Sequence, residues 1–321
     1  MIASSNPEQW KALIPDTLVQ SFAKNDPPVV FVGSGLGMEA VPSLGTADHL
    51  CEMLRKQLRL ADHGEGLAEL LQYYKNSVAG SKRDVAEWLK GALRFNVAKP
   101  GGAHYLLLAL PVREVITTNF DLLLNDAAAT CRKKIVSADS SNSYRDSLRT
   151  LGVNDILLGR LHGSFHSDDK IVATTDDYIE SFHEHDWSEI FAEYCRSKRL
   201  LFIGYSLRDF NIWTSYITAL MRSKHMASAH VMVSPARGSH AVEFWKRYNV
   251  NLVQLEAGQF LTGLHSALGG LEKPWLVLRA AAAAHRRMTL NQIDDLIRKV
   301  QKEHGFEKRE LAALSILMDS A

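Results

Sequence analysis

The chain has 321 residues, of which 46% are hydrophobic and 23% charged, a balance typical of a globular protein with a large core. Its formal net charge of +1 supplies no broad basic surface, so direct nucleic-acid binding is not expected. No apolar run reaches the roughly 20 residues that cross a bilayer, and the first residues show no secretory signal. The three separated cysteines (Cys51, Cys131 and Cys195) exclude a four-cysteine zinc site within the chain and suit a reducing cytoplasm.

Short β-type runs alternate with helical patterns along the chain, as in a parallel sheet covered by helices. The runs are almost continuously apolar, which is expected of strands that are buried on both faces. The six predicted strands are 28–32, 114–118, 155–161, 199–203, 230–233 and 251–255. The sequence therefore predicts an α/β, Rossmann-like fold with a mainly parallel sheet and helices on both faces.

A long, mostly helical interval, about 46–110, separates the first two predicted strands. Leucines recur at helical spacing in H-L-C-E-M-L-R-K-Q-L and in D-V-A-E-W-L-K-G-A-L. Connections between a strand and the next helix are usually only a few residues long. We therefore expect an inserted helical subdomain here. A later interval, 164–187, is rich in Asp and His and predicts a loop with a short helix.

The pattern changes after about residue 272. A run of five alanines forms helices readily, and 289–319 has the spacing of two amphipathic helices separated at Gly305. We expect a single α/β domain over 1–272 and a helical tail over 273–321.

The first predicted strand runs into three glycines, in V-V-F-V-G-S-G-L-G (29–37). Glycines here would let a phosphate approach main-chain N–H groups. The spacing lacks the third glycine of G-x-G-x-x-G, and no G-K-[ST] follows, so the stretch is neither a standard dinucleotide fingerprint nor a P-loop. Nucleotide binding and a plain strand-to-helix turn both remain open at this point.

The stretch T-T-N-F-D (117–121) places Asn119 and Asp121 at the carboxyl end of the second predicted strand. Open α/β sheets bind their ligands at this end. Asn and Asp also begin helices well, so a helix cap is the alternative interpretation. One cap would explain one of the two residues and leave the other as a candidate site residue.

Two later strands also end in glycine and polar residues. His162, in L-H-G-S, is a candidate general base, although a lone histidine is more often structural. Gly204 and Ser206 follow the strand at 199–203, where Ser206 is also a candidate helix cap. Four such strand ends in one sheet predict a shared site.

The ordered set G-x-G, T-N-x-D, L-H-G and G-x-S-L resembles the sirtuins, and most of all their prokaryotic relatives that consume NAD in anti-phage defence. The resemblance covers about 28–255. It implies that Gly33, Ser34 and Gly35 belong to a phosphate-cradling loop.

The same resemblance implies roles for the later motifs. Asn119 would lie beside the ribose and the reactive water, and Asp121 near the nicotinamide carboxamide. His162 would be the base near the ribose hydroxyls, while Gly204 and Ser206 would contact the ribose and phosphate.

The chain departs from the deacylating sirtuins in two places. Their zinc module, with two C-x-x-C pairs, is missing, because only Cys195 lies in the corresponding interval. The first loop reads V-P-S-L-G-T-A-D in place of an Asp-Phe-Arg stretch, and Gly37 stands where the family usually has serine. The missing module favours an NAD glycohydrolase over a deacylase. We expect NAD as substrate, nicotinamide and ADP-ribose as products, and no zinc or other metal.

The resemblance further implies a cytoplasmic antiviral effector that depletes NAD on activation, as in abortive infection. An NAD hydrolase that is always active would kill its host, so we expect a homo-oligomer, a regulatory partner such as an ATPase or sensor protein, or both. No membrane association is expected. Two alternatives stay open: a non-catalytic module that senses NAD or a related nucleotide, and an NAD-dependent protein deacylase or ADP-ribosyltransferase.

Overall fold

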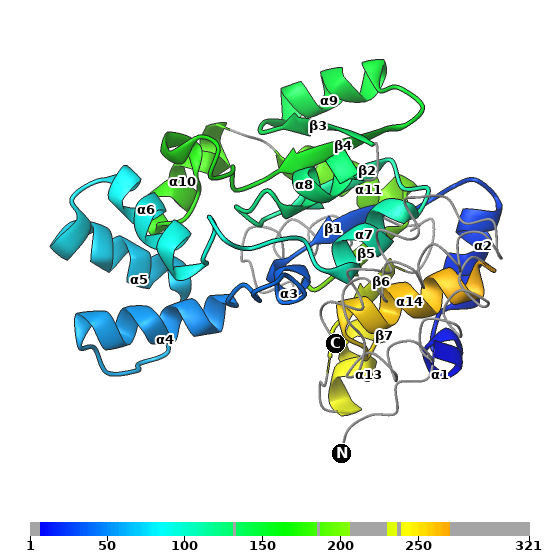
Figure 1. Ribbon diagram of the computed structural model, residues 1–321, viewed down its shortest axis with the longest axis horizontal. Helices are drawn as coiled ribbons and strands as arrows, with labels where there is room; N and C mark the ends of the chain where they lie inside the picture. Colours follow the sequence, from blue (N-terminus) through cyan, green and yellow to red (C-terminus); the bar gives the residue numbers. More distant parts are fainter. Residues whose placement is uncertain (1–6, 131–132, 185–186, 206–229, 236–238, 270–321) are drawn as a thin grey trace, which may run out of the picture.

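The architecture is a single parallel sheet with helices on both faces (Figure 1). The computed structural model describes residues 7–130, 133–184, 187–205, 230–235 and 239–269. Within this part of the chain the sheet has seven strands in the order β3-β4-β2-β1-β5-β6-β7, and each neighbouring pair is parallel. The strands are β1 (Val29–Val32), β2 (Glu114–Thr117), β3 (Lys134–Ala138), β4 (Asp155–Arg160), β5 (Leu200–Ile203), β6 (His230–Val233) and β7 (Val250–Val253). The predicted fold class is confirmed, and all six predicted strands are present.

The sequence prediction missed β3. Among the described strands, β3 lies at the edge of the sheet and pairs with β4 alone. Only Ala138 among its five residues is buried, and Ile135 and Val136 are its only large apolar residues. A short edge strand does not need the continuous apolar run that identifies the inner strands.

Side chains of each inner strand point alternately to the two faces of the sheet. Val30 and Val32 of β1 join one core, and Val29 and Phe31 join the other. The first core is completed by α2 (Asp16–Ala23), α7 (Gly102–Ala109), α8 (Leu123–Thr130) and α14 (Ala257–Ala267). The second core is completed by α9 (Ser141–Thr150), α11 (Trp187–Ser197) and α13 (Ser239–Arg247). α1 (Pro7–Lys11) packs against α14.

The inserted helices form a third core beside the sheet, on the left in Figure 1. They are α4 (Ala47–Leu58), α5 (Leu67–Tyr74), a π-helix (Lys75–Ala79) and α6 (Lys82–Ala92). One leucine from each α-helix is fully buried there: Leu54, Leu71 and Leu89. Phe165, Ile171 and Ala173, from the segment after His162, join this core. By contrast, α7 packs in the core of the sheet.

Three ion pairs tie the inserted helices to the segment after β4. They join Lys75 to Asp176 (3.6 Å), Lys82 to Asp177 (2.9 Å) and Lys90 to Asp168 (2.7 Å). The acidic partners lie on a short 3₁₀ helix (Asp168–Lys170) and on α10 (Thr175–Glu184). The segment predicted as a loop with a short helix is therefore attached to the insertion.

Asp177 is the most buried partner of these pairs. Its carboxylate also accepts hydrogen bonds from the N–H groups of Ala173 (3.1 Å) and Thr174 (2.9 Å). Burial acts to raise the pKa of Asp177, but the hydrogen bonds and the Lys82 ammonium outweigh it, so the pKa lies below its ordinary value.

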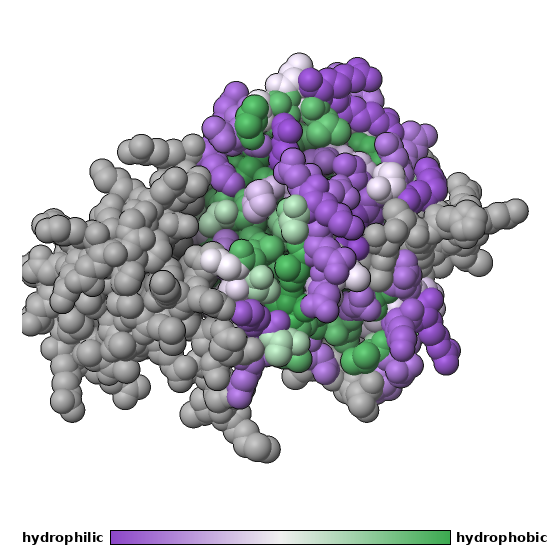
Figure 2. All heavy atoms as spheres, turned by 90° about the vertical axis from the view of Figure 1, so that its right-hand side faces the viewer, coloured by the Kyte–Doolittle hydropathy of each residue, from purple (hydrophilic) through white to green (hydrophobic). Residues whose placement is uncertain are grey.

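Figure 2 shows the face on the right-hand side of Figure 1, where apolar side chains gather between polar ones. No helix within the described residues is long and apolar enough to cross a bilayer. The predicted tail, 273–321, lies outside the described residues.

The Asp177 cluster generates the first prediction. Asp177→Asn should lower the free energy of unfolding by about 2–3 kcal/mol at pH 7, because it leaves Lys82 without its buried counter-charge. Asp176→Asn, on the same helix but exposed, should cost less than about 1 kcal/mol. The native pKa of Asp177 is depressed, so its contribution is present above the unfolded pKa and is lost as the pH falls through the native value. Urea unfolding between pH 7 and pH 2 should therefore show the gap between parent and Asp177→Asn narrowing below about pH 4. Equal losses for the two variants would contradict this account.

Candidate functional site

The four motif-bearing strands end side by side. Their last residues are paired in one row: Val32 with Thr117, Thr117 with Arg160, and Val32 with Ile203. The segments that follow therefore leave the sheet along one edge, which is its carboxyl edge. Within two residues of these ends lie Gly33, Asn119, His162 and Gly204.

Asn119 joins the ends of β1 and β2. Its side-chain Nδ2 donates to the carbonyl of Gly33 at 3.1 Å, and its backbone N–H donates to Thr117 Oγ1 at 3.0 Å. Thr117 Oγ1 in turn donates to the carbonyl of Val32 at 3.0 Å. A helix-capping side chain would accept an N–H group from the first helical turn. The Asn119 amide instead donates across the sheet, so the capping interpretation fails for this residue.

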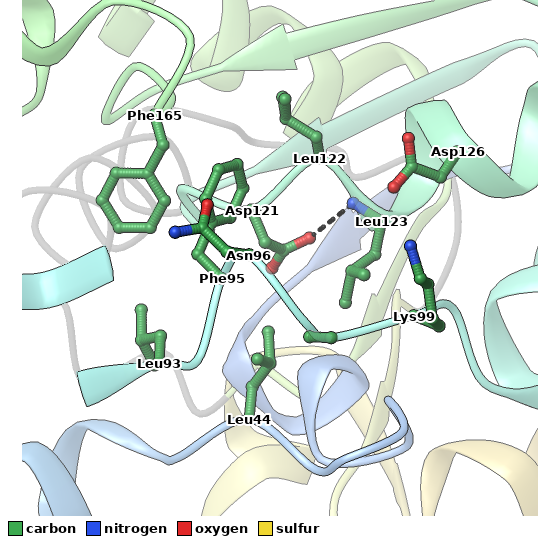
Figure 3. A pocket seen from close by; sticks show the side chains of 11 residues that line it. Leu44, Leu93, Phe95, Asn96, Lys99, Asp121, Leu122, Leu123, Asp126 and Phe165 are labelled. Atoms are coloured by element: carbon green, nitrogen blue, oxygen red, sulfur yellow. Dashed lines mark hydrogen bonds between the residues drawn. The ribbon is translucent and has the colours of Figure 1, made fainter. Parts of the chain in front are cut away.

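Asp121 does contact the following helix. Its Oδ1 accepts the N–H group of Leu123, the first residue of α8, at 3.1 Å (Figure 3). The pKa of Asp121 is raised by burial, against the lowering effects of the Leu123 hydrogen bond, the Arg160 charge and a hydrogen bond with Asn119. The carboxyl group thus takes part in the helix start and in a partly buried polar cluster.

Arg160 is a residue that the motif analysis missed. It ends β4 and is 3% exposed. Its guanidinium donates to the carbonyls of Asn119 (3.4 Å) and Asp121 (3.0 Å) and to the side chain of Asn125 (2.7 Å). Burial lowers the pKa of Arg160, and the neighbouring Asp121 acts in the opposite direction. The signal in the sequence is an arginine within the apolar strand L-L-G-R-L, where a buried charge needs partners.

His162 lies beside the same segment, and its ring contacts two aromatic side chains. Its ring centroid is 6.4 Å from that of Phe120 and 5.0 Å from that of Tyr178 on α10. The side chain is 9% exposed, and the carbonyl of His162 accepts the N–H group of Val172 at 3.0 Å. Strand β4 therefore brings His162 to the predicted edge, and α10 packs against its ring.

Two hollows lie around Asp121. A pocket of about 240 Å³ opens between the end of the insertion and the start of α8 (Figure 3). It is lined by Leu44, Leu93, Phe95, Asn96, Ala98, Lys99, Asp121, Leu122, Leu123, Asp126 and Phe165. A second cavity, of about 10 Å³, is lined by Val32, Leu36, His104, Thr117, Asn119, Asp121, Leu124 and Arg160. Asp121 is common to both, whereas His162 lines neither of them.

His104 is a second residue that the motif analysis passed over. It is 1% exposed, and its Nδ1 accepts the N–H group of Gly101 at 3.1 Å. Burial lowers the pKa of His104 to about 4, so its ring is neutral at pH 7. It presents a neutral imidazole to the cavity beside Asn119.

Gly33 and Gly35 have a packing role that the sequence did not indicate. A Cβ atom on Gly33 or on Gly35 would lie 2.6 Å from atoms of Gly204, and Gly204 itself has a φ of +60°. The N–H groups of Gly33 and Gly35 donate to the carbonyls of Ile203 (3.1 Å) and Gly204 (2.9 Å). These glycines therefore allow two backbone loops to touch, and phosphate contact by this loop stays a prediction.

Ser34 and Ser206 are the remaining predicted site residues. Ser34 is exposed at the start of the short helix α3 (Ser34–Gly37). Ser206 lies outside the described residues. Within the described residues, no group of three or more His, Cys, Asp or Glu side chains is arranged to hold a metal ion.

Sequence comparison finds that the part of the chain that holds this edge resembles SIR2-like proteins. Residues 113–253 match the family model described as a SIR2-like domain. The motif-based resemblance is therefore confirmed for this part of the chain, which runs from just before β2 to the end of β7. The glycine loop after β1 lies outside the matched range.

Three curated relatives are all named NAD(+) hydrolase ThsA. The protein from Bacillus cereus is 26% identical over 219 residues, which cover 66% of this chain and 44% of the relative. The one from Acinetobacter baumannii is 27% identical over 224 residues, which cover 67% and 43%. The one from Enterococcus faecium is 27% identical over 150 residues, which cover 46% and 30%. The chain thus spans less than half the length of these relatives.

Among solved structures, a Sir2 homologue mutant in complex with ADP ribose aligns with 80% of this chain and 97% of its own. Its sequence identity is 13% and its TM-score is 0.47.

The second prediction concerns the contact between the two glycine loops, which begin at Gly33 after β1 and at Gly204 after β5. Gly204→Ala should lower the free energy of unfolding by about 2 kcal/mol or more, because φ is positive and the new Cβ atom would lie 2.5 Å from the backbone nitrogen of Leu36. A Cβ atom on Gly91, in α6, would point into open space, so Gly91→Ala should stabilise by about 0.5–1 kcal/mol. Thermal unfolding of both variants checks this. A Gly204→Ala variant as stable as the parent would show that the loops do not pack this closely.

Proposed function

We propose that the chain is the catalytic part of an NAD glycohydrolase. Water would replace nicotinamide at C1′ of the ribose, giving nicotinamide, ADP-ribose and a proton. One observation carries this proposal: the Asn119 amide and the Asp121 carboxyl group come together where β1 and β2 end, next to a pocket of about 240 Å³. The ThsA relatives, named as NAD(+) hydrolases, support it.

The reaction breaks the C1′–nitrogen bond through a state with oxocarbenium character, as in other glycosidic cleavages. Such a state needs a well-placed water and polar groups around the ribose more than it needs a strong nucleophile. Asn119 orients the water or a ribose hydroxyl, and His162 accepts the proton. Asp121 contacts the nicotinamide carboxamide from the wall of the pocket.

The rest of the nucleotide lies along the carboxyl edge of the sheet. Gly33, Ser34 and Gly35 contact the phosphates, and Gly204 and Ser206 contact the ribose and phosphate on the other side of β1. Because the N–H groups of Gly33 and Gly35 already donate to protein carbonyls, Ser34 is the more important donor of this loop. No metal takes part in this scheme.

The biological role follows from the same proposal. The protein is an antiviral effector in the cytoplasm, and its activation depletes NAD and stops growth. Control falls to self-association or to a regulatory partner such as an ATPase or sensor protein, since uncontrolled hydrolysis of NAD is toxic to the cell.

A non-catalytic module that senses NAD is the second candidate. It is favoured by the position of His162, whose ring packs against Phe120 and Tyr178 and lines neither hollow. A protein deacylase or ADP-ribosyltransferase is less favoured, because the sequence lacks the cysteines of the zinc module.

Product analysis separates the three functions. The purified protein is incubated with NAD, with and without an acetylated peptide, and the products are followed by chromatography. Nicotinamide and ADP-ribose formed without peptide support the hydrolase. Acetylated ADP-ribose formed only with peptide supports a deacylase, and bound but intact NAD supports the sensing module.

The third prediction concerns Asn119 and distinguishes an effect on NAD cleavage from an effect on NAD binding. Asn119→Ala should abolish cleavage and leave NAD affinity within a few-fold, because its amide acts mainly as charge develops in the transition state. Asn119→Asp, which keeps the shape but not the amide donor, should behave in the same way. The matched control is Asn76→Ala, an exposed position on the inserted helices that should keep the parent rate.

Calorimetric titration gives the affinities, and hydrolysis of a fluorogenic NAD analogue gives the rates. His162→Ala should lose about 10²–10⁴ in rate with little change in affinity. If Asn119→Ala cleaves as fast as Asn76→Ala, then Asn119 only braces the ends of β1 and β2, and the proposed mechanism is wrong.

A further inference from the structure

Arg160 is a buried cation. Its hydrogen-bond partners within the described residues are Asn119 and Asp121 of the candidate site and Asn125 on α8. Arginine is rarely as buried as the 3% exposure seen here unless its charge is matched. Removing a guanidinium from water is costly, and hydrogen bonds from its fixed fork of donors must offset that cost. The partners of Arg160 therefore indicate what the residue contributes.

The guanidinium holds both ends of the three-residue segment from Asn119 to Asp121. One terminal nitrogen donates to the two carbonyls of that segment, at 3.4 Å and 3.0 Å. The other donates to Asn125 on α8 at 2.7 Å. A single rigid fork on β4 thus fixes the turn between β2 and α8, from which the Asn119 amide reaches Gly33.

The same guanidinium lies next to Asp121, because it donates to the Asp121 carbonyl at 3.0 Å and lines the small cavity together with it. Its positive charge acts to lower the pKa of the Asp121 carboxyl group, although burial leaves that pKa above its ordinary value. Other titratable or charged groups face that carboxyl group from the elements around it. His104 of α7 lines the small cavity and is neutral, while Lys99 and Asp126 line the pocket. Because the Asp121 carboxyl group is buried, a cation beside it favours its ionised form.

We propose that Arg160 is a positioning residue, which fixes the Asn119–Asp121 turn and places a positive charge beside Asp121. The proposal deepens the proposed NAD site and rests on it for the substrate. Arg160 acts through Asn119 and Asp121, and its donors go to protein acceptors. The residue thereby sets the place of the amide and the charge of the carboxyl group.

The two contributions can be separated by substitution. Arg160→Met keeps the apolar stem of the side chain but removes both charge and fork, whereas Arg160→Lys keeps the charge and loses the fork. The carboxyl pKa of Asp121 should rise by about 1 to 3 pH units in Arg160→Met and stay close to the parent value in Arg160→Lys. Both variants should lose about 10- to 100-fold in kcat, because small displacements of positioned groups are costly.

Arg113→Met is the matched control. Arg113 precedes β2 and also donates to two backbone carbonyls, those of Leu151 (3.2 Å) and Gly152 (3.1 Å), but it does so at the amino edge of the sheet. Arg113 is exposed, so its variant controls for the loss of a guanidinium that holds backbone carbonyls, and thermal unfolding measures the loss of stability of each variant. A loss of stability alone would not move the pH dependence of the site.

The experiment measures two quantities in the parent and the three variants. Carbon-detected NMR titration, with the Asp121 signal assigned through Asp121→Asn, gives the carboxyl pKa without any substrate. NAD cleavage between pH 4 and pH 9 gives kcat and kcat/KM, and thermal unfolding shows that each variant is folded. If Arg160→Met does not fold, the kcat of Arg160→Lys against Arg113→Met decides the positioning role.

The expected result is an acid limb of kcat/KM that moves to higher pH in Arg160→Met together with the Asp121 pKa, with Arg113→Met unchanged. A folded Arg160→Met variant with the parent pKa of Asp121 would overturn the proposal, as would rate losses no larger than those of Arg113→Met. If the parent itself does not cleave NAD, the proposed function fails, while the titration of Asp121 still decides the role of Arg160.

Discussion

The register of the four central strands is the constraint on which the site depends. Parallel pairing places the last residues of β2, β1, β4 and β5 in one row, so the polar segments that follow must leave the sheet together. The order of the strands changes direction at β1, since β2 and β4 lie on one side of it and β5 on the other. Such a switch point at the carboxyl edge is where open α/β sheets bind ligands. The glycine loops after β1 and β5 touch each other at this edge, and the pocket of about 240 Å³ lies at Asp121, beside the segment that follows α6.

Asn119 and Asp121 each make a hydrogen bond within the protein, and each also has a role in the proposed reaction. The Asn119 amide bridges to Gly33, and the Asp121 carboxyl group starts α8 while it faces the pocket. Hydrogen bonds that hold these groups in place without a ligand would reduce the cost of ordering them during the proposed reaction. The segments that flank the inserted helices, at Leu44 and at 93–99, contribute the other wall. The ion pairs at Asp168, Asp176 and Asp177 hold the inserted helices to the segment that follows His162.

The sequence was sufficient for the sheet and for the edge, because buried strands leave continuous apolar runs and their ends carry glycine and polar residues. The sequence did not identify β3, because a strand at the edge of the sheet needs few apolar residues. It also gave no sign of the packing role of Gly33 and Gly35, since the close approach of Gly204 depends on a neighbour distant in the chain. Arg160 and His104 were missed for a related reason: Arg160 has its partners on the turn after β2 and on α8, and His104 lines a cavity that only the folded chain forms. The choice between cap and site at Asn119 likewise required the position of β1.

The central claim is that the nicotinamide end of NAD lies between Asp121 and the end of the inserted helices. The most direct measurement is a crystal structure of the protein with a carbocyclic NAD analogue that cannot be cleaved at C1′. The account predicts the carboxamide within hydrogen-bond distance of Asp121, with the sugar beside Asn119 and the phosphates near Ser34. An analogue bound at the amino edge of the sheet, or with its nicotinamide ring away from Asp121, would contradict it.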